Sequence, residues 1–253
     1  MTQLGARLSR DPRRPHALGG ILRMPNESLV ELCGMVGMDF VLLDCEHGPA
    51  DGSALLHHVA ASEAAGLTCL VRTSGIDPVE ILRLLDLGVS GIVVPHVSTA
   101  TQARSAVAAA HYPPLGERGM AVYTRAGRYG LASVESHLAA AERTIVVVMI
   151  EDMAGVAAAE AVLGTQGVDG VLVGPSDLAL SARTAGLGPQ AAAEAQSSVE
   201  GQAHRLDRTV VRIVSDEAGA AAALDDGCQV VLLNLQALLT KRLAHVADAV
   251  LAR

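Results

Sequence analysis

The sequence predicts a single (β/α)8 barrel that spans residues 1–253, and three observations lead to this prediction. Short runs of β-branched and aliphatic residues alternate with longer Ala- and Leu-rich stretches of helical period, which is the pattern of parallel strands joined by crossover helices. A length of 253 residues is ordinary for one closed barrel. Hydrophobic residues make up 50% of the chain but aromatic residues only 2%, so the core must consist of closely packed aliphatic side chains.

Strand-like and helix-like segments follow one another along the whole chain. The predicted strands are 17–22, 40–44, 68–72, 91–95, 144–151, 170–174, 209–214 and 229–234. The predicted helices are 26–37, 51–65, 78–87, 99–110, 131–142, 153–164, 189–206, 216–226 and 235–252.

Local signals support several helix starts and mark two long connections. Asp77 and Pro78 place an N-cap before a proline at the first helical position, and Asp216 puts negative charge at the positive end of a helix dipole. The connections at 111–130 and 181–189 are longer than plain turns, and long Gly-rich loops in a compact barrel are usually functional or mobile.

Charge and composition exclude several classes of function. The formal net charge is −8 and the 19 Lys and Arg residues are scattered, so we expect no nucleic-acid partner. No apolar run reaches the roughly 18 residues of a membrane helix, and no apolar stretch of a secretory signal follows the basic N-terminus. We therefore expect a cytoplasmic protein without membrane contact. The cysteines form no CxxC pair and are interpreted as buried structural thiols; they are Cys33, Cys45, Cys69 and Cys228.

Polar residues gather at the carboxyl ends of the predicted strands, which is where barrels of this class carry their active sites. One such residue alone often only caps the next helix, but several carboxylates around one mouth, with few cations to offset them, favour a bound divalent cation. The residues are Asp44, Cys45, Glu46 and His47 after the second strand, Arg72 at the third, Glu151 and Asp152 at the fifth, Gly174, Pro175, Ser176 and Asp177 after the sixth, and Asn234 at the eighth.

Glu151 and Asp177 are the predicted metal ligands. Two carboxylates with water and substrate oxygens form a hard, oxygen-rich site that suits Mg²⁺ or Mn²⁺, and Co²⁺ also fits. The metal would polarise a bound carbonyl and stabilise an enolate, with Arg72 as a second positive group. His47 is the predicted proton carrier, and Asp44 would fix its tautomer.

The turn Gly174-Pro175-Ser176 precedes a short helix and offers backbone N–H groups that would bind a carboxylate. Together these groups describe a 2-oxo acid chelated to a metal. His96 follows the fourth strand, where an approach to the mouth and a packing or hydrogen-bonding role both remain open. His111 and His137 are interpreted as surface or loop residues.

At these residues the sequence resembles the HpcH/HpaI family of class II 2-keto-3-deoxy-acid aldolases. The ordered blocks that carry the resemblance are FVLLDCEHGPAD (40–51), VRTSGIDPVEILRLLDLGVSGIVVPHV (71–97), YPPLGERG (112–119), MIED (149–152) and VDGVLVGPSDLALS (168–181). The resemblance implies a TIM barrel of the type that binds phosphoenolpyruvate or pyruvate. It also implies a metal-dependent carbon–carbon lyase that cleaves or forms 4-hydroxy-2-oxo acids through a pyruvate enolate, with an aldehyde as the other partner.

The family also implies a role for each matching residue. The roles are metal binding by Glu151 and Asp177, stabilisation of the enolate oxygen by Arg72, proton transfer by His47 with Asp44, and carboxylate binding by backbone amides near Pro175 and Ser176. A homo-hexamer, built as a trimer of dimers that exchange C-terminal helices, is implied as well.

The chain departs from the family pattern near the substrate. Met149 stands where many family aldolases have a Gln, and the first strand is followed by Arg23, Met24 and Asn26 instead of the usual aromatic residues. The loop 119–130 offers further groups for an anionic co-substrate, namely Tyr123, Arg125 and Arg128.

Two other functions compete with the aldolase. Met149 and the Arg-bearing loop motivate a transferase of the citrate synthase type found in siderophore pathways, which would condense oxaloacetate with acetyl-CoA. A non-catalytic metabolite-binding barrel is the third hypothesis, although a decayed site should have lost some of its costly buried charges.

Overall fold

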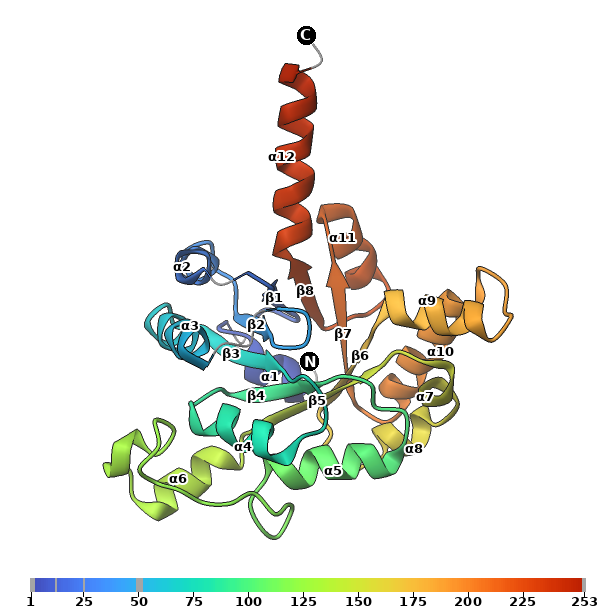
Figure 1. The fold of residues 1–253 in the computed structure, drawn as a ribbon. Coiled ribbons are helices and arrows are strands. Elements are labelled where there is room, and N and C mark those ends of the chain that lie inside the picture. The colour runs from blue at the N-terminus through green and yellow to red at the C-terminus, as the bar shows by residue number, and fades with distance from the viewer. Residues whose placement is uncertain (1–2, 12, 25, 49–51, 252–253) are drawn as a thin grey trace.

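A computed structural model describes residues 3–11, 13–24, 26–48 and 52–251, and it shows a closed barrel of parallel strands in the order β1 to β8, with β8 paired to β1 (Figure 1). The prediction of a (β/α)8 barrel is confirmed. The strands are β1 (Ala17–Leu22), β2 (Phe40–Asp44), β3 (Thr68–Arg72), β4 (Gly91–Val94), β5 (Ile145–Ile150), β6 (Gly170–Val173), β7 (Thr209–Val214) and β8 (Val230–Asn234).

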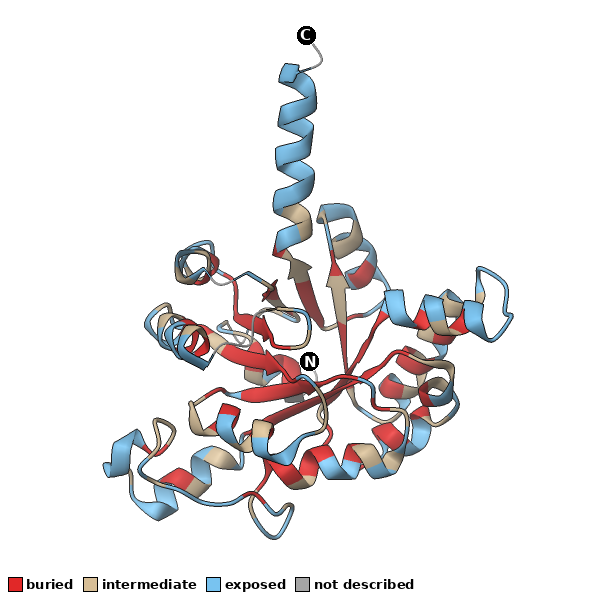
Figure 2. Cartoon of the chain, viewed as in Figure 1, coloured by how far each residue is buried: buried red, intermediate tan, exposed pale blue. Residues whose placement is uncertain are grey.

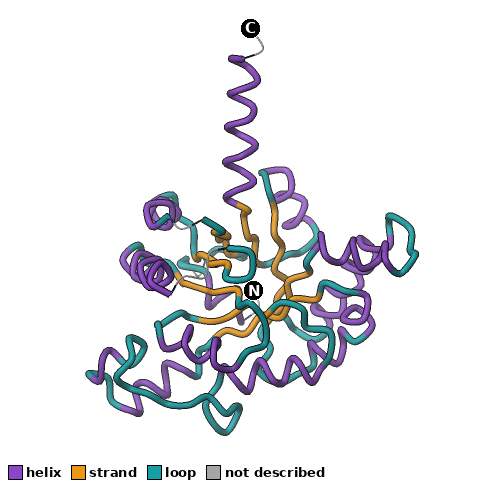
Figure 3. Tube along the Cα trace, viewed as in Figure 1, coloured by secondary structure: helices purple, strands orange, loops and turns teal. Residues whose placement is uncertain are grey.

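Helices surround this ring of strands (Figure 3). They are α1 (Gln3–Leu8), α2 (Glu27–Met35), α3 (Gly52–Ala64), α4 (Pro78–Asp86), α5 (Ala100–Ala110), the 3-10 turn η1 (Arg128–Gly130), α6 (Val134–Ala141), α7 (Met153–Ala157), α8 (Ala159–Leu163), α9 (Pro175–Thr184), α10 (Ala191–Arg205), α11 (Glu217–Asp225) and α12 (Leu235–Leu251). Asp77 and Asp216 cap α4 and α11 as expected, each accepting a backbone N–H.

Two helical features differ from the prediction. The predicted helix 153–164 is divided at Ala158, whose N–H bonds back to Ala154 and Gly155 in a tightened turn. The connection 181–189 is only partly a loop, because α9 starts at Pro175 and continues to Thr184. Pro175 at the first helical position was the sequence signal for this helix.

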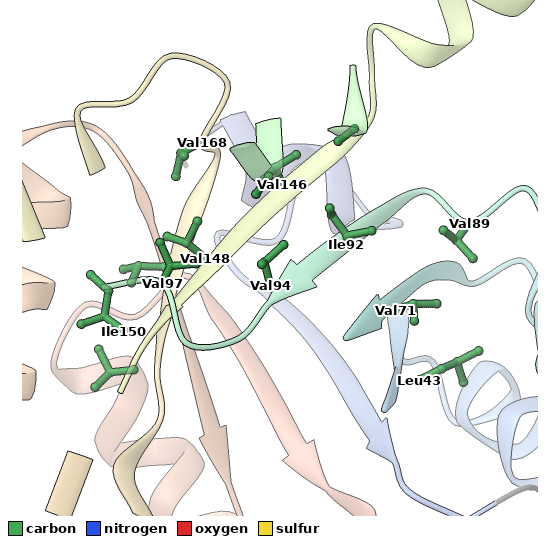
Figure 4. Close-up of a cluster of buried hydrophobic side chains, with 14 of the residues drawn as sticks. Leu43, Val71, Val89, Ile92, Val94, Val97, Val146, Val148, Ile150 and Val168 are labelled. Atoms are coloured by element: carbon green, nitrogen blue, oxygen red, sulfur yellow. The ribbon is translucent and has the colours of Figure 1, made fainter. Parts of the chain in front are cut away.

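Two apolar layers hold the barrel. The inner layer fills the space enclosed by the strands with side chains such as Phe40 and Leu172, and Leu4 and Leu8 of α1 extend it at the amino-terminal end. The outer layer lies between the strands and the helices, where the strands appear as the most buried part of the chain (Figure 2). Figure 4 shows part of it around Ile92, Val146 and Val148. Small β-branched residues predominate, as the low aromatic content required.

The cysteines are confirmed as buried, free thiols. Burial raises the pKa of Cys69 to about 12 and that of Cys45 to about 11. The interpretation of His137 was wrong, because it is buried within α6, where its Nε2 lies 2.9 Å from the Tyr112 hydroxyl. His111 lies in the connection after α5, as a loop residue would, but its side chain is buried.

The loop 119–130 lies away from the mouth formed by the carboxyl ends of the strands. Its backbone bonds to Asp86 at the end of α4, and Arg125 donates to the carbonyl of Leu87 and forms an ion pair with Glu63. Connections from a helix to the next strand lie at the amino-terminal face of a barrel, and this loop is one of them. The expectation that Tyr123, Arg125 and Arg128 meet a co-substrate is therefore wrong for the barrel's own mouth.

The helix α12 points away from the barrel, with its end far from the strands (Figure 1). Residues along most of its length are exposed (Figure 2). None of the described helices is both long enough and apolar enough to cross a membrane.

Candidate active site and metal centre

Asp44, at the end of β2, organises one side of the mouth. The strand register places it level with Arg72 at the end of β3. Arg72 donates from Nε to Oδ1 at 2.9 Å and from Nη2 to Oδ2 at 2.5 Å, and Arg23 Nε donates to Oδ2 at 2.8 Å. Burial alone would raise the pKa of Asp44, but the hydrogen bonds and charge of Arg72, with help from Arg23, bring that pKa below its usual range.

This pairing directs the third nitrogen of Arg72, Nη1, toward Glu46 and Met149. Nη1 lies 2.9 Å from Glu46 Oε2 and 3.8 Å from the sulfur of Met149. The contact with Glu46 is an ion pair without hydrogen-bond geometry, since Oε2 has no hydrogen-bond partner among the described residues. The guanidinium is buried and held at two nitrogens by Asp44, so Nη1 has a fixed direction.

Three side chains that follow the ends of β2, β4 and β5 meet at the centre of the site. Glu46, His96 and Glu151 each offer a ligand atom, and these atoms all lie within 4.8 Å of one another. His96 Nε2 is 2.9 Å from Glu46 Oε1 and its Nδ1 is 3.1 Å from Glu151 Oε1. Two carboxylates and an imidazole at this spacing are suited to hold one metal ion.

Glu151 is the most strongly perturbed of these groups. Burial raises the pKa of its carboxyl, and the charges of Glu46 and Asp177 raise it further, while the backbone N–H of His96, which donates to Oε1 at 2.6 Å, lowers it. Its side chain is 1% exposed, and Oε2 has no hydrogen-bond partner in the part of the chain that the structure describes. A buried, unpartnered carboxylate oxygen fits a site for a cation.

The start of α9 forms the opposite side of the mouth. Asp177 is exposed on the first turn, and its charge acts on Glu151, so the two predicted ligands share one electrostatic environment. Of the residues predicted to bind a carboxylate, Gly174 already donates its N–H to the carbonyl of Ile150 at 3.2 Å, and Pro175 has no N–H. Ser176 and Asp177 therefore provide the N–H groups that the helix start can offer to a ligand.

His47 lies at the rim, with its side chain 55% exposed. Its Nε2 is 3.7 Å from Glu46 Oε2. Asp44 accepts the backbone N–H of His47 at 3.1 Å, and no bond joins the Asp44 carboxylate to the imidazole within the described ranges. The expected control of the His47 tautomer by Asp44 is thus not seen, because both Asp44 oxygens are occupied by the two arginines.

Sequence reasoning gave no role to Glu46 and left His96 open. Both residues carried a signal, since Glu46 belongs to the polar run after β2 and His96 follows β4. Their meeting with Glu151 depends on the register between β4 and β5, which places Val94 opposite Val148 and brings His96 alongside the end of β5. A single sequence does not reveal this register.

The fold and the mouth together define a (β/α)8 barrel with an acid-rich centre fitted to a divalent cation. The sequence model of the HpcH/HpaI aldolase/citrate lyase family matches residues 22–233, and the chain belongs to this family.

Similar proteins agree with this assignment. A 5-keto-4-deoxy-D-glucarate aldolase of Klebsiella pneumoniae subsp. pneumoniae is 40% identical over 157 residues, which are 62% of this chain and 60% of that protein. A pyruvate aldolase of Rhizobium etli is 34% identical over 91% of this chain and 89% of that protein. A crystal structure of an HpcH/HpaI aldolase/citrate lyase family protein from Burkholderia cenocepacia J2315 superposes with a TM-score of 0.87 at 28% identity, covering 99% of both chains.

Proposed function

We propose that this protein is a metal-dependent aldolase, a carbon–carbon lyase that cleaves or forms 4-hydroxy-2-oxo acids through a pyruvate enolate. Similarity to proteins named pyruvate aldolase and 5-keto-4-deoxy-D-glucarate aldolase supports the proposal. The observation that carries it is the buried Glu151 carboxylate, which faces two further acids and leaves one oxygen without a hydrogen-bond partner among the described residues.

Glu151 and Asp177 would hold the metal, with Glu46 close to Glu151. Carboxylate oxygens fit Mg²⁺ or Mn²⁺, and Co²⁺ is also compatible. When bound, the metal supplies positive charge that polarises the 2-oxo group and stabilises the enolate. It would also offset the repulsion among the three acids.

Arg72 would stabilise the oxygen that gains negative charge as the enolate forms. Asp44 holds Nε and Nη2, so Nη1, which lies 2.9 Å from Glu46 Oε2, is the nitrogen that would donate to a substrate oxygen. A donor that is fixed before the reaction needs no reorientation as the charge develops. Ser176 N–H would hold the carboxylate of the same 2-oxo acid.

His47 would move the proton. In the cleavage direction, a base removes the proton of the C4 hydroxyl, the C3–C4 bond breaks, and its electron pair forms the enolate as the aldehyde leaves. The enolate then takes a proton at C3 to give the methyl group of pyruvate. The exposed rim position of His47 suits a base that exchanges protons with solvent, directly or through water.

The decisive experiment is exchange of the pyruvate methyl protons with D2O, followed by NMR. Metal-loaded protein should catalyse this exchange, and chelator-treated protein and the Glu151→Ala variant should not. A positive result would justify a panel of aldehydes in a cleavage assay. Absence of exchange in the metal-loaded protein would overturn the proposal. Release of CoA from acetyl-CoA with oxaloacetate would then identify a transferase, and inactivity in both assays a metabolite-binding barrel.

We also infer that the protein forms a homo-oligomer through α12, and we expect the hexamer implied by the family. Four exposed apolar residues recur at spacings of four, three and four along this helix, namely Leu239, Leu243, Val246 and Val250. Such a stripe is typical of a helix that packs on another surface. Light scattering should give a hexamer for the protein and smaller species for a Leu243→Glu, Val246→Glu variant. A monomeric parent protein would contradict the inference. The cytoplasmic location of the protein stays a prediction.

A further inference from the structure

We propose that His96 is a direct protein ligand of the metal and that its imidazole makes the centre prefer Co²⁺ and Ni²⁺ to Mg²⁺. This inference deepens the proposed function and rests on it, because it concerns the same metal. It differs from the carboxylate-only site that the sequence predicts, in which the hard oxygen donors of Glu151 and Asp177 favour Mg²⁺ or Mn²⁺.

The two ring nitrogens of His96 face different carboxylates, and we assign each a separate role. Nδ1 lies 3.1 Å from Oε1 of the Glu151 carboxylate, whose other oxygen, Oε2, has no hydrogen-bond partner among the described residues. Nε2 lies 2.9 Å from Glu46 Oε1. Metal-binding histidines commonly donate their other ring N–H to a carboxylate, which fixes the tautomer and the ring orientation. Nδ1 is therefore assigned to the metal and Nε2 to a hydrogen bond with Glu46.

The backbone holds His96 in this position at some cost. Its φ angle is +55°, in the left-handed region that residues other than glycine rarely adopt. The N–H of His96 donates to Glu151 Oε1 at 2.6 Å, and the N–H of Val97 donates to the carbonyl of Met149 at 3.0 Å. These bonds fix the end of β4 against β5 and direct the imidazole over Glu151. Backbone conformations of this kind are concentrated at functional sites.

The donor set decides the metal preference. Mg²⁺ prefers carboxylate, carbonyl and water oxygens, whereas imidazole suits the later first-row metals, whose affinities rise from Mn²⁺ through Co²⁺ to Ni²⁺. An imidazole ligand should therefore strengthen binding of Co²⁺ and Ni²⁺ much more than binding of Mg²⁺.

The test is calorimetric titration of chelator-treated, full-length protein with Mg²⁺, Mn²⁺, Co²⁺ and Ni²⁺. The variant is His96→Asn, because Asn tolerates the left-handed backbone and should preserve the fold. Loss of this ligand should raise the dissociation constants of Co²⁺ and Ni²⁺ by about 10- to 100-fold, the range found even for residues that only support ligands. The constant for Mg²⁺ should change by less than about threefold.

His47→Asn is the matched control, because it removes another imidazole from the same mouth and should leave metal affinity unchanged. Pulsed electron paramagnetic resonance of the Mn²⁺-loaded protein adds a readout independent of affinity. Coupling to the ¹⁴N of an imidazole should be present in the parent protein and in His47→Asn, and absent in His96→Asn. If folding of His96→Asn fails, His96→Gly removes the ring and relieves the strained backbone.

The possible outcomes separate this inference from the proposed function. Unchanged Co²⁺ affinity in His96→Asn, or a persistent ¹⁴N signal, would overturn the role of His96 while leaving the metal site intact. Unchanged affinity for every metal in Glu151→Gln would overturn the metal site itself, and with it the proposed function.

Discussion

Gly174→Ala should displace the Glu151 carboxylate and weaken metal binding. A Cβ atom at this position would lie 2.4 Å from Glu151 Oε2 and 2.8 Å from Glu151 Cβ, whereas ordinary contacts begin at 3.4 Å. Relief of the first overlap requires a movement of about 1 Å. Rotation of the side chain cannot relieve the second, because Cβ is fixed to the strand. Metal–ligand distances tolerate only about 0.2 Å.

We therefore expect metal affinity to fall by about 10- to 100-fold. The free energy of unfolding of the metal-free protein should fall by about 1–3 kcal/mol, the usual cost of overpacking. Urea denaturation and calorimetric metal titration measure the two quantities. Gly75→Ala is the control, since a Cβ there meets nothing within 4 Å. If Gly174→Ala binds metal and unfolds as the parent protein does, the close packing of Gly174 on Glu151 is refuted as the reason for glycine at this position.

Three further perturbations test other parts of the structure. Asp44→Ala leaves the buried Arg72 without its main partner, so urea denaturation should show that the free energy of unfolding falls by about 3–5 kcal/mol. A fall of less than about 1 kcal/mol would mean that the ion pair contributes little to stability. Cys69 should resist thiol reagents at pH 8 until the protein is unfolded. Because folding raises the pKa of Cys69 and Cys45, the unfolded state loses these protons first, and stability should fall above pH 9 by about 1.4 kcal/mol per pH unit for each thiol. The variant with Ser at both positions should show a shallower slope than the parent protein, since burial also raises the pKa of the remaining thiols Cys33 and Cys228. Metal at 100 times its dissociation constant should raise the free energy of unfolding of the parent protein by about 2.7 kcal/mol. The Glu151→Gln variant should show no such gain. An equal gain in both proteins would mean that the metal binds elsewhere.

The strands were the most predictable part of the fold, because buried parallel strands are nearly continuous aliphatic runs. Those at 17–22, 40–44, 68–72 and 209–214 have the predicted bounds. Helices were harder to predict where tertiary contacts decide the outcome. The short α1 has little helical signal of its own, but Leu4 and Leu8 are buried in the inner core.

The site was predictable where it depends on strand ends and unpredictable where it depends on register and competing partners. The sequence placed Asp44, Arg72 and Glu151 at one mouth because parallel strands share a carboxyl end. It could not show that Arg23 and Arg72 together occupy both Asp44 oxygens, so that the Asp44 carboxylate makes no hydrogen bond with the His47 imidazole among the described residues. Nor could it show that the N–H of Gly174 bonds to the carbonyl of Ile150, so that the available N–H groups are those of Ser176 and Asp177.

Positive and negative side chains occupy different parts of the mouth. Arg23 and Arg72 both bind Asp44, so the mouth has two guanidinium groups around one carboxylate on the side of β2 and β3. Glu46 and Glu151 lie beyond them, with Arg72 Nη1 as the nearest guanidinium nitrogen to Glu46. Negative charge is thus concentrated where His96 and a cation would lie, and positive charge where the substrate oxygen would gain electrons. An imidazole at this position can coordinate the metal, whereas a further carboxylate would add to the repulsion by Glu46 and Asp177 that already raises the pKa of Glu151.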